Sequence, residues 1–296
     1  MTSVGSHSAP AGEPPADMPG SSREPRGRAW LHPGLILLAG LLILRFPVEV
    51  IAYYFHSAWA RGADTGLTPV LTVLLILVER RRLQEFHIDG WALLLYIAAP
   101  LAGWVMYRNG FFNVNEVLQV APIAAICLAI GLLLTRTRLP RFEWQTLAWM
   151  GAAVVLGLAA AAVMGVGEGI SHQIPGLVQE PASDYWRRLA PGIFQQFLYQ
   201  TAGAASLEEP LFRGFLWGYL KQARWRDSWI WLLQAGLFML GHFYYFGRLW
   251  FSFWFIVPVA ALFLGWLAWR SRSIAPGMLA HGIINTFSIM FASVRW

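Results

Sequence analysis

The sequence is poor in charge, in cysteine and in lysine. Only 13% of its 296 residues are charged, whereas 57% are hydrophobic. Soluble globular domains carry about 25% charged residues, so the composition excludes an ordinary soluble domain and indicates a membrane protein with several spanning segments. The single cysteine, Cys127, excludes an intrachain disulfide framework.

Three sequence patterns typical of hydrolases are also missing. No His-Glu-x-x-His segment gives the usual metalloprotease helix. No Gly-x-Ser-x-Gly segment indicates a serine nucleophile elbow, and no Gly-x-Gly-Asp segment indicates an aspartyl intramembrane protease. Any hydrolytic chemistry therefore needs a different set of side chains.

Long apolar runs dominate what is present. They are long enough to predict an all-α fold, a polytopic membrane helical bundle of about eight to nine transmembrane helices. The second run is the shortest. The runs fall near residues 31–55, 66–79, 91–107, 117–134, 144–164, 190–220, 229–246, 250–269 and 274–293.

Basic residues between the runs predict the topology. Alternate connections, starting with the amino-terminal segment, hold fourteen Lys and Arg residues, whereas the others hold six. The positive-inside rule therefore predicts a cytoplasmic amino terminus and an external carboxyl terminus. It also explains the formal charge of +6 without nucleic acid. One lysine against many arginines, with abundant Ala, Gly and Trp, suggests a bacterial gene and an inner or plasma membrane.

The chain divides into three predicted parts. Residues 1–28 have no apolar periodicity and no signal-peptide pattern, so they predict a disordered cytoplasmic tail. Residues 29–189 predict accessory transmembrane helices and end in a long external connection near 165–189. Residues 190–293 predict the functional core.

Charged residues inside the sixth run are the strongest functional signal. An ionisable side chain at the centre of a bilayer costs about 2.5–3.5 kcal/mol, so Glu208, Glu209 and Arg213 need partners or a polar cavity. Glu209 and Arg213 are four residues apart and can pair on one helix face. Glu208 is turned about 100° away and is free to face a cavity. Pro210 is predicted to loosen the helix beside it.

Two histidines and an asparagine fall at similar predicted depths in later runs. At 1.5 Å per residue from the predicted cytoplasmic ends, Glu208 and His242 lie at about 18 and 20 Å, and His281 and Asn285 at about 10 and 16 Å. The four side chains can therefore meet near the middle of the membrane. His281 and Asn285 are also four residues apart, so both present polar groups on one face.

These groups suit peptide hydrolysis. Glu208 could deprotonate a water, and the other three could hold that water and the developing oxyanion. Zinc is the alternative, with Glu208, His242 and His281 as ligands and an open position for water. We favour catalysis without a cofactor because the usual metalloprotease spacing is missing.

Structural interpretations remain beside the catalytic one. Glu209 and Arg213 could simply stabilise the helix packing, and a single membrane histidine is more often an interhelical hydrogen-bonding group than a catalyst. Arg45 and Glu49 are four residues apart in the first run, and we interpret them as a structural pair with no further partners.

Three motifs in the predicted core resemble those of the CAAX prenyl protease and bacteriocin-processing family of intramembrane endopeptidases. They are Glu208-Glu209-x-x-x-Arg213, Phe238-x-x-x-His242 and His281-x-x-x-Asn285. The resemblance covers about residues 190–293, and the earlier helices match only as generic membrane helices.

The resemblance implies a role for each motif residue. Glu208 would be the essential base and His242 would help to hold the attacking water. His281 and Asn285 would stabilise the oxyanion. Glu209 and Arg213 would support the site. The family's members have been described both as metalloproteases and as glutamate-dependent enzymes.

The function predicted from the sequence is therefore an intramembrane endopeptidase acting on membrane-associated, lipidated or apolar peptides. A non-catalytic scaffold or immunity protein and a transporter with a buried charge relay are the alternatives. The first five runs hold few polar residues, which favours the peptidase over the transporter. The expected partners are a peptide or protein substrate and the lipid bilayer. The sequence does not distinguish a prenylated peptide, a bacteriocin leader and a sorting signal as substrate.

Overall fold

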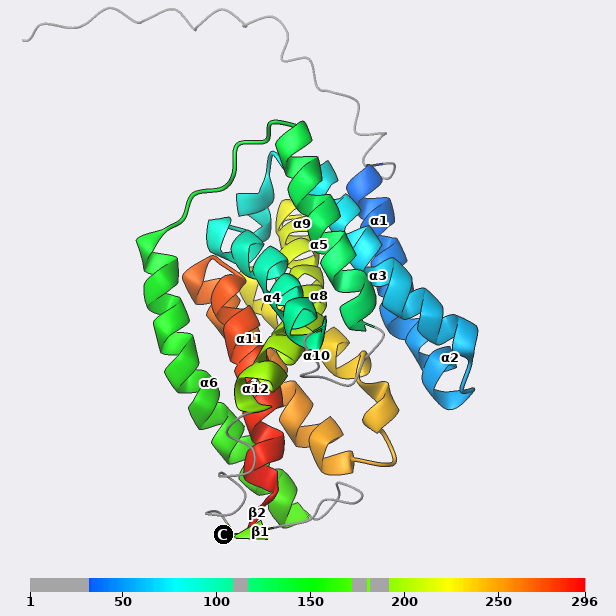
Figure 1. Cartoon of the computed structure of the whole chain (residues 1–296), viewed down its shortest axis with the longest axis vertical. Helices are drawn as coiled ribbons and strands as arrows, with labels where there is room; N and C mark the ends of the chain where they lie inside the picture. Colours follow the sequence, from blue (N-terminus) through cyan, green and yellow to red (C-terminus); the bar gives the residue numbers. More distant parts are fainter. Residues whose placement is uncertain (1–31, 109–116, 172–179, 182–191, 296) are drawn as a thin grey trace, which may run out of the picture. The chain divides into compact units, whose positions relative to one another are not determined.

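The computed structural model of the chain describes residues 32–108, 117–171, 180–181 and 192–295. The predicted tail at residues 1–28 lies outside this part. The fold is an all-α helical bundle, as predicted (Figure 1). Its helices outside the central segment 192–222 are α1 (Pro33–Ile43), α2 (Glu49–Tyr54), α3 (Ala58–Val78), α4 (Gly90–Arg108), α5 (Val117–Leu134), α6 (Trp144–Ser171), α10 (Asp227–Leu240), α11 (Val257–Ser271) and α12 (Ala275–Ala292).

Every predicted apolar run contains a helix, but three boundaries differ from the prediction. Helix α3 begins eight residues before the predicted run, and α6 continues to Ser171, into the predicted connection. Helix α10 ends at Leu240, so the prediction of a helix to residue 246 is wrong. Gly241 follows as the C-cap with right-handed helical dihedrals, and His242 is the first residue whose backbone leaves that region.

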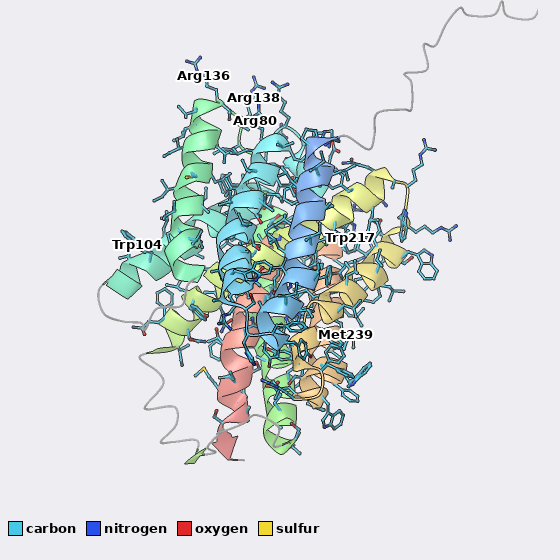
Figure 2. All side chains as sticks on the ribbon, turned by 90° about the vertical axis from the view of Figure 1, so that its right-hand side faces the viewer. Arg80, Trp104, Arg136, Arg138, Trp217 and Met239 are labelled. Carbon is cyan, nitrogen blue, oxygen red and sulfur yellow. The ribbon has the colours of Figure 1, made fainter. Side chains whose placement is uncertain are left out.

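Four helical stretches in the described residues are long and apolar enough to cross a membrane, and two shorter apolar helices accompany them. Large apolar side chains such as Ile36, Leu133 and Val163 are exposed on their outer faces. In Figure 2, Arg80, Arg136 and Arg138 gather at one end of the bundle. The charge count places these three residues on the same side of the membrane.

The central helical segment changes its winding around the two glutamates. Residues 192–200 are α-helical and Thr201–Ala205 form a π-helical turn. Helix α8 (Ser206–Glu209) then carries both carboxylates, and the π-helical segment Pro210–Leu216 leads into α9 (Trp217–Gln222). Pro210 has no N–H to donate to Ser206, so the predicted loosening takes the form of wider π winding.

Helices α6 and α12 lie side by side and run parallel (Figure 1). A methyl group on Gly157 would lie 3.2 Å from the Ala280 Cα, and one on Gly165 would meet the Ser288 carbonyl. Small residues let membrane helices approach closely and gain van der Waals contact. This packing fixes α12, which carries His281 and Asn285, against a helix that the sequence marks only as accessory.

Two further helices complete the surroundings of the site. A π-helical turn at Ser252–Ile256 precedes α11, and a short 3-10 helix at Phe243–Tyr245 follows α10.

Two-residue strands β1 (Glu180–Pro181) and β2 (Val294–Arg295) pair in parallel beyond the end of α12. A large apolar core packs around Phe212 and Phe215, so the central segment is enclosed by other helices.

Candidate active site

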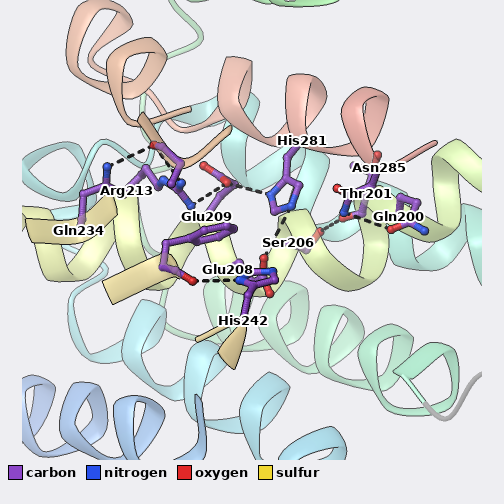
Figure 3. Close-up of polar contacts among 12 residues, drawn as sticks. Gln200, Thr201, Ser206, Glu208, Glu209, Arg213, Gln234, His242, His281 and Asn285 are labelled. Carbon is purple, nitrogen blue, oxygen red and sulfur yellow. Dashed lines mark hydrogen bonds and ion pairs between the residues drawn. The ribbon is translucent and has the colours of Figure 1, made fainter. Parts of the chain in front are cut away.

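The two adjacent glutamates of α8 face different surroundings (Figure 3). The Glu209 side chain is 0% exposed, whereas the Glu208 side chain is 12% exposed. One residue along an α-helix turns the side chain by about 100°, which accounts for the difference. The predicted separation of the two glutamates into different environments is present in the structure.

Glu209 forms a buried ion pair with Arg213. The Arg213 Nη1 lies 3.1 Å from the Glu209 Oε1, and its Nη2 donates to the Ala261 carbonyl at 3.2 Å. The guanidinium also lies 4.2 Å from the centre of the Phe238 ring. A Cβ on Gly277 would come within 2.8 Å of the Glu209 Oε2, so glycine makes room for this carboxylate. Arg213 is therefore held by three kinds of contact inside the bundle.

His281 lies between the two carboxylates. Its Nδ1–H donates to the Glu209 Oε1 at 3.0 Å, and its Nε2 lies 3.6 Å from the Glu208 Oε2. Glu209 thus does more than pair with Arg213, because it fixes the orientation of the His281 ring. The Glu208 Oε2 is buried and has no hydrogen-bond partner among the described residues.

His242 lies in the turn after α10. Its Nδ1 is 2.9 Å from the Phe238 carbonyl, and a carbonyl only accepts, so Nδ1 carries the proton and donates. In the neutral ring, Nε2 is therefore the free acceptor. The Phe238 and His242 rings are in contact, with centroids 4.6 Å apart and planes tilted by 36°, as the four-residue spacing suggests.

Asn285 is one turn along α12 from His281. Its Nδ2 donates to the Gln200 Oε1 at 3.2 Å. An amide nitrogen has two hydrogens, so one remains for another acceptor in the cavity. Gln200 has no role in the sequence prediction, and no local pattern marks it, because it lies two turns before Glu208 in an apolar run.

These groups share one cavity of about 340 Å³. Glu208, His242, His281 and Asn285 all line it, together with Gln200. They come from the central segment, from the turn after α10 and from α12. The structure therefore brings together the four residues that the sequence predicts to be catalytic, while Glu209 and Arg213 lie behind them.

Arg45 is the charged neighbour that the sequence prediction missed. Its Nη1 lies 2.9 Å from the Glu49 Oε2, but its Nη2 lies 2.5 Å from the Glu208 Oε1. The interpretation of Arg45 and Glu49 as a pair without further partners is therefore wrong. Arg45 passes close to Gly241, where a Cβ would lie 2.9 Å from its Nε. The position of Arg45 inside the first apolar run was the sequence signal for a further partner besides Glu49.

Glu208 also borders a second cavity, of about 210 Å³, on the side of α3. Arg45 and Asp64 line this second cavity, and the Thr68 Oγ1 donates to the Asp64 Oδ1 at 3.1 Å. Glu168 of α6 lines the first cavity. The early helices thus contribute charged groups on both sides of Glu208, which corrects the expectation that they hold few polar residues of interest.

The ligands considered for zinc do not form a compact set. Among the described residues, no three His, Cys, Asp or Glu side chains are grouped as a metal site would require. Glu208, His242 and His281 line one cavity, but both His281 ring nitrogens face carboxylates. Metal dependence stays a prediction.

Comparison with known families agrees with the geometry. Residues 190–287 match the family model of type II CAAX prenyl endopeptidases described as Rce1-like, and all six predicted site residues lie within the match. No curated protein and no solved structure matches the chain. Residues 190–287 are therefore similar to the Rce1-like CAAX prenyl endopeptidases, a protease family, and the long apolar helices support an integral membrane protein.

Proposed function

We propose that the protein is an intramembrane endopeptidase that hydrolyses a peptide bond with a water activated by Glu208. The observation that supports this most is the single cavity lined by Glu208, His242, His281 and Asn285. Peptide hydrolysis needs a base, a position for water and donors for the oxyanion, and these four side chains can supply all of them.

Glu208 is the base in this mechanism. Arg45 binds its Oε1, so Oε2 is the oxygen that faces His281 and can take a proton. The Nε2 of His242 is the free acceptor on the cavity wall and holds the attacking water from its other side. The water thus loses a proton to Glu208 as its oxygen attacks the carbonyl carbon.

His281 and Asn285 stabilise the oxyanion. Glu209 accepts from the Nδ1 of His281, which leaves Nε2 to receive the proton from Glu208 and to present it to the oxyanion or to the leaving amine. The second hydrogen of the Asn285 amide supplies another donor. Glu209 and Arg213 contribute by fixing the His281 ring rather than by touching substrate.

The substrate is a membrane-associated, lipidated or apolar peptide. A comparison of membrane proteomes between cells with the wild-type protein and cells with Glu208→Ala tests the activity directly. We expect one or a few membrane proteins to keep a segment in the variant that the wild type removes. Identical proteomes, together with no cleavage of the enriched candidates by purified wild type, would favour a scaffold or a transporter.

Chelation separates the two hydrolytic mechanisms. The glutamate mechanism predicts that the enzyme stays active in the presence of chelators. It also predicts that the purified protein contains no stoichiometric metal. If zinc is the cofactor, metal analysis finds about one equivalent per chain, and readdition restores a stripped sample. That second result would replace the base mechanism by one in which Glu208, His242 and His281 bind zinc.

A further inference from the structure

The first cavity contains one carboxylate that hydrolysis does not use. Glu168 lies on α6, and its Oε1 accepts from the Ser252 Oγ at 2.6 Å. Both residues line the cavity that Glu208 borders. Ser252 is buried and holds the carboxylate in place on the cavity wall.

Glu168 differs from the other glutamates of the site because it has no cationic partner. Glu208 pairs with Arg45, and Glu209 pairs with Arg213. Within the described part of the chain, no ion pair to Glu168 forms, and no Lys or Arg lines the first cavity. A carboxylate on the wall of a protein cavity interacts more strongly with a cation that enters than a carboxylate in bulk water does.

The packing of α6 on α12 gives the position of Glu168 along the cavity. The two helices are in parallel register, because Gly157 approaches Ala280 and Gly165 approaches Ser288. Glu168 is three residues beyond Gly165, so it lies level with residue 291, about ten residues past His281. This offset is about 15 Å at 1.5 Å per residue. An extended peptide covers it in about four to five residues.

We propose that Glu168 binds a cationic group of the substrate, four to five residues from the scissile bond. The group is a Lys or Arg side chain or a free amino terminus. This inference rests on the proposed peptidase function and names a feature of its substrates. An acidic residue at the same position is rejected, because it would place two carboxylates together in the cavity.

The test uses purified full-length enzyme and quenched peptides based on a sequence that the wild type cleaves. Each set carries Lys, Gln or Glu at one position, four or five residues to either side of the scissile bond. At one position or more, we expect the wild type to show a kcat/KM at least about tenfold higher for Lys than for Glu. Acetylated and free amino termini distinguish a terminal amine from a side chain.

Variants then assign that preference to Glu168. Glu168→Gln should bring the Lys-to-Glu ratio toward one, and Glu168→Lys should invert it, while both still cleave the Gln peptide. Asp64→Asn is the matched control, since Asp64 lines the second cavity, and it should leave the ratio unchanged.

The wild-type measurement alone can overturn the proposal, so the test does not require that any variant folds. A Lys-to-Glu ratio near or below one at every position, with the Gln peptide cleaved, removes the cationic subsite but leaves the peptidase standing. A ratio that Glu168→Gln leaves unchanged assigns the preference to another residue. A peptide set that wild type and Glu208→Gln cleave equally contradicts the peptidase mechanism itself.

Discussion

Glu208 and Glu209 are neighbours in sequence, yet one pairs with an arginine far away in the chain and the other with an arginine one turn further on. Glu209 pairs with Arg213 of its own helix, and neither side chain has any exposed surface. Glu208 pairs with Arg45 of the first helix and borders two cavities. One carboxylate is fully enclosed by the protein, whereas the other is 12% exposed and lies at the wall of a cavity.

The comparison shows how one helix can stabilise the fold and supply a reactive group at adjacent positions. A fully buried pair with additional hydrogen bonds is rigid, and removing one partner leaves an uncompensated charge. A pair beside a cavity keeps one carboxylate oxygen for chemistry. Substitutions at the two positions should therefore affect different properties, stability for the enclosed pair and turnover for the pair at the cavity.

The largest expected effect separates the two glutamates. Glu208→Gln keeps the shape and loses the base, so we expect turnover to fall by about 10²–10⁴-fold in a protein that still inserts and folds. Glu209→Gln should instead lower the thermal stability in detergent, because Arg213 loses its counter-charge. Near-normal cleavage by Glu208→Gln would remove Glu208 from the mechanism.

Arg213→Ala tests the enclosed pair from its other side. It leaves the Glu209 carboxylate buried without a cation, and we expect a loss of about 3–5 kcal/mol in stability, seen as low expression or a lower melting temperature. Arg138→Ala, at an exposed arginine, is the control and should change little. If Arg213→Ala is fully stable yet inactive, Arg213 belongs to the catalytic groups instead.

Substitutions of Arg45 test the ion pair at the cavity, and we expect them to have an intermediate effect on activity. Arg45→Met removes the positive charge beside Glu208, so the acid limb of the kcat/KM profile should move to higher pH by about one unit or more. Arg45→Lys keeps the charge and should restore most of the profile. A stable Arg45→Met enzyme with an unchanged acid limb would show that the ion pair has no part in catalysis.

The prediction with the smallest effect on activity concerns stability away from the site. Burial lowers the pKa of the His87 imidazole, in the connection between α3 and α4, to about 4, and Arg272 lowers it further. Below pH 6.5 the unfolded chain binds a proton that the folded chain does not. Stability should therefore fall between pH 6.5 and 4, by up to about 3 kcal/mol.

His87→Asn should flatten that decline. Asparagine also suits the left-handed backbone of this residue, which has a φ of 56°. His56→Asn is the control, because His56 is exposed and has a similar positive φ of 51°. If the melting temperatures of wild type and His87→Asn fall equally with pH across this range, the prediction is wrong.

The sequence by itself determined the class of fold and most residues of the candidate site. Long apolar runs favour helices, because a helix satisfies its backbone polar groups within the segment, and charges inside such runs need a function or a partner. Spacings of four residues then fixed which side chains share a face, so the pairing of Glu209 with Arg213 and the contact of Phe238 with His242 followed from local geometry.

Only the tertiary structure decided which distant groups meet. Arg45 and Glu208 are far apart in the chain, and no local pattern links them, because their contact depends on how the first helix packs on the central one. The same holds for Gln200 with Asn285 and for Glu168 in the cavity. Helical periodicity acts over a few residues, whereas these contacts depend on how close two helices come, which glycines such as Gly165 and Gly241 set.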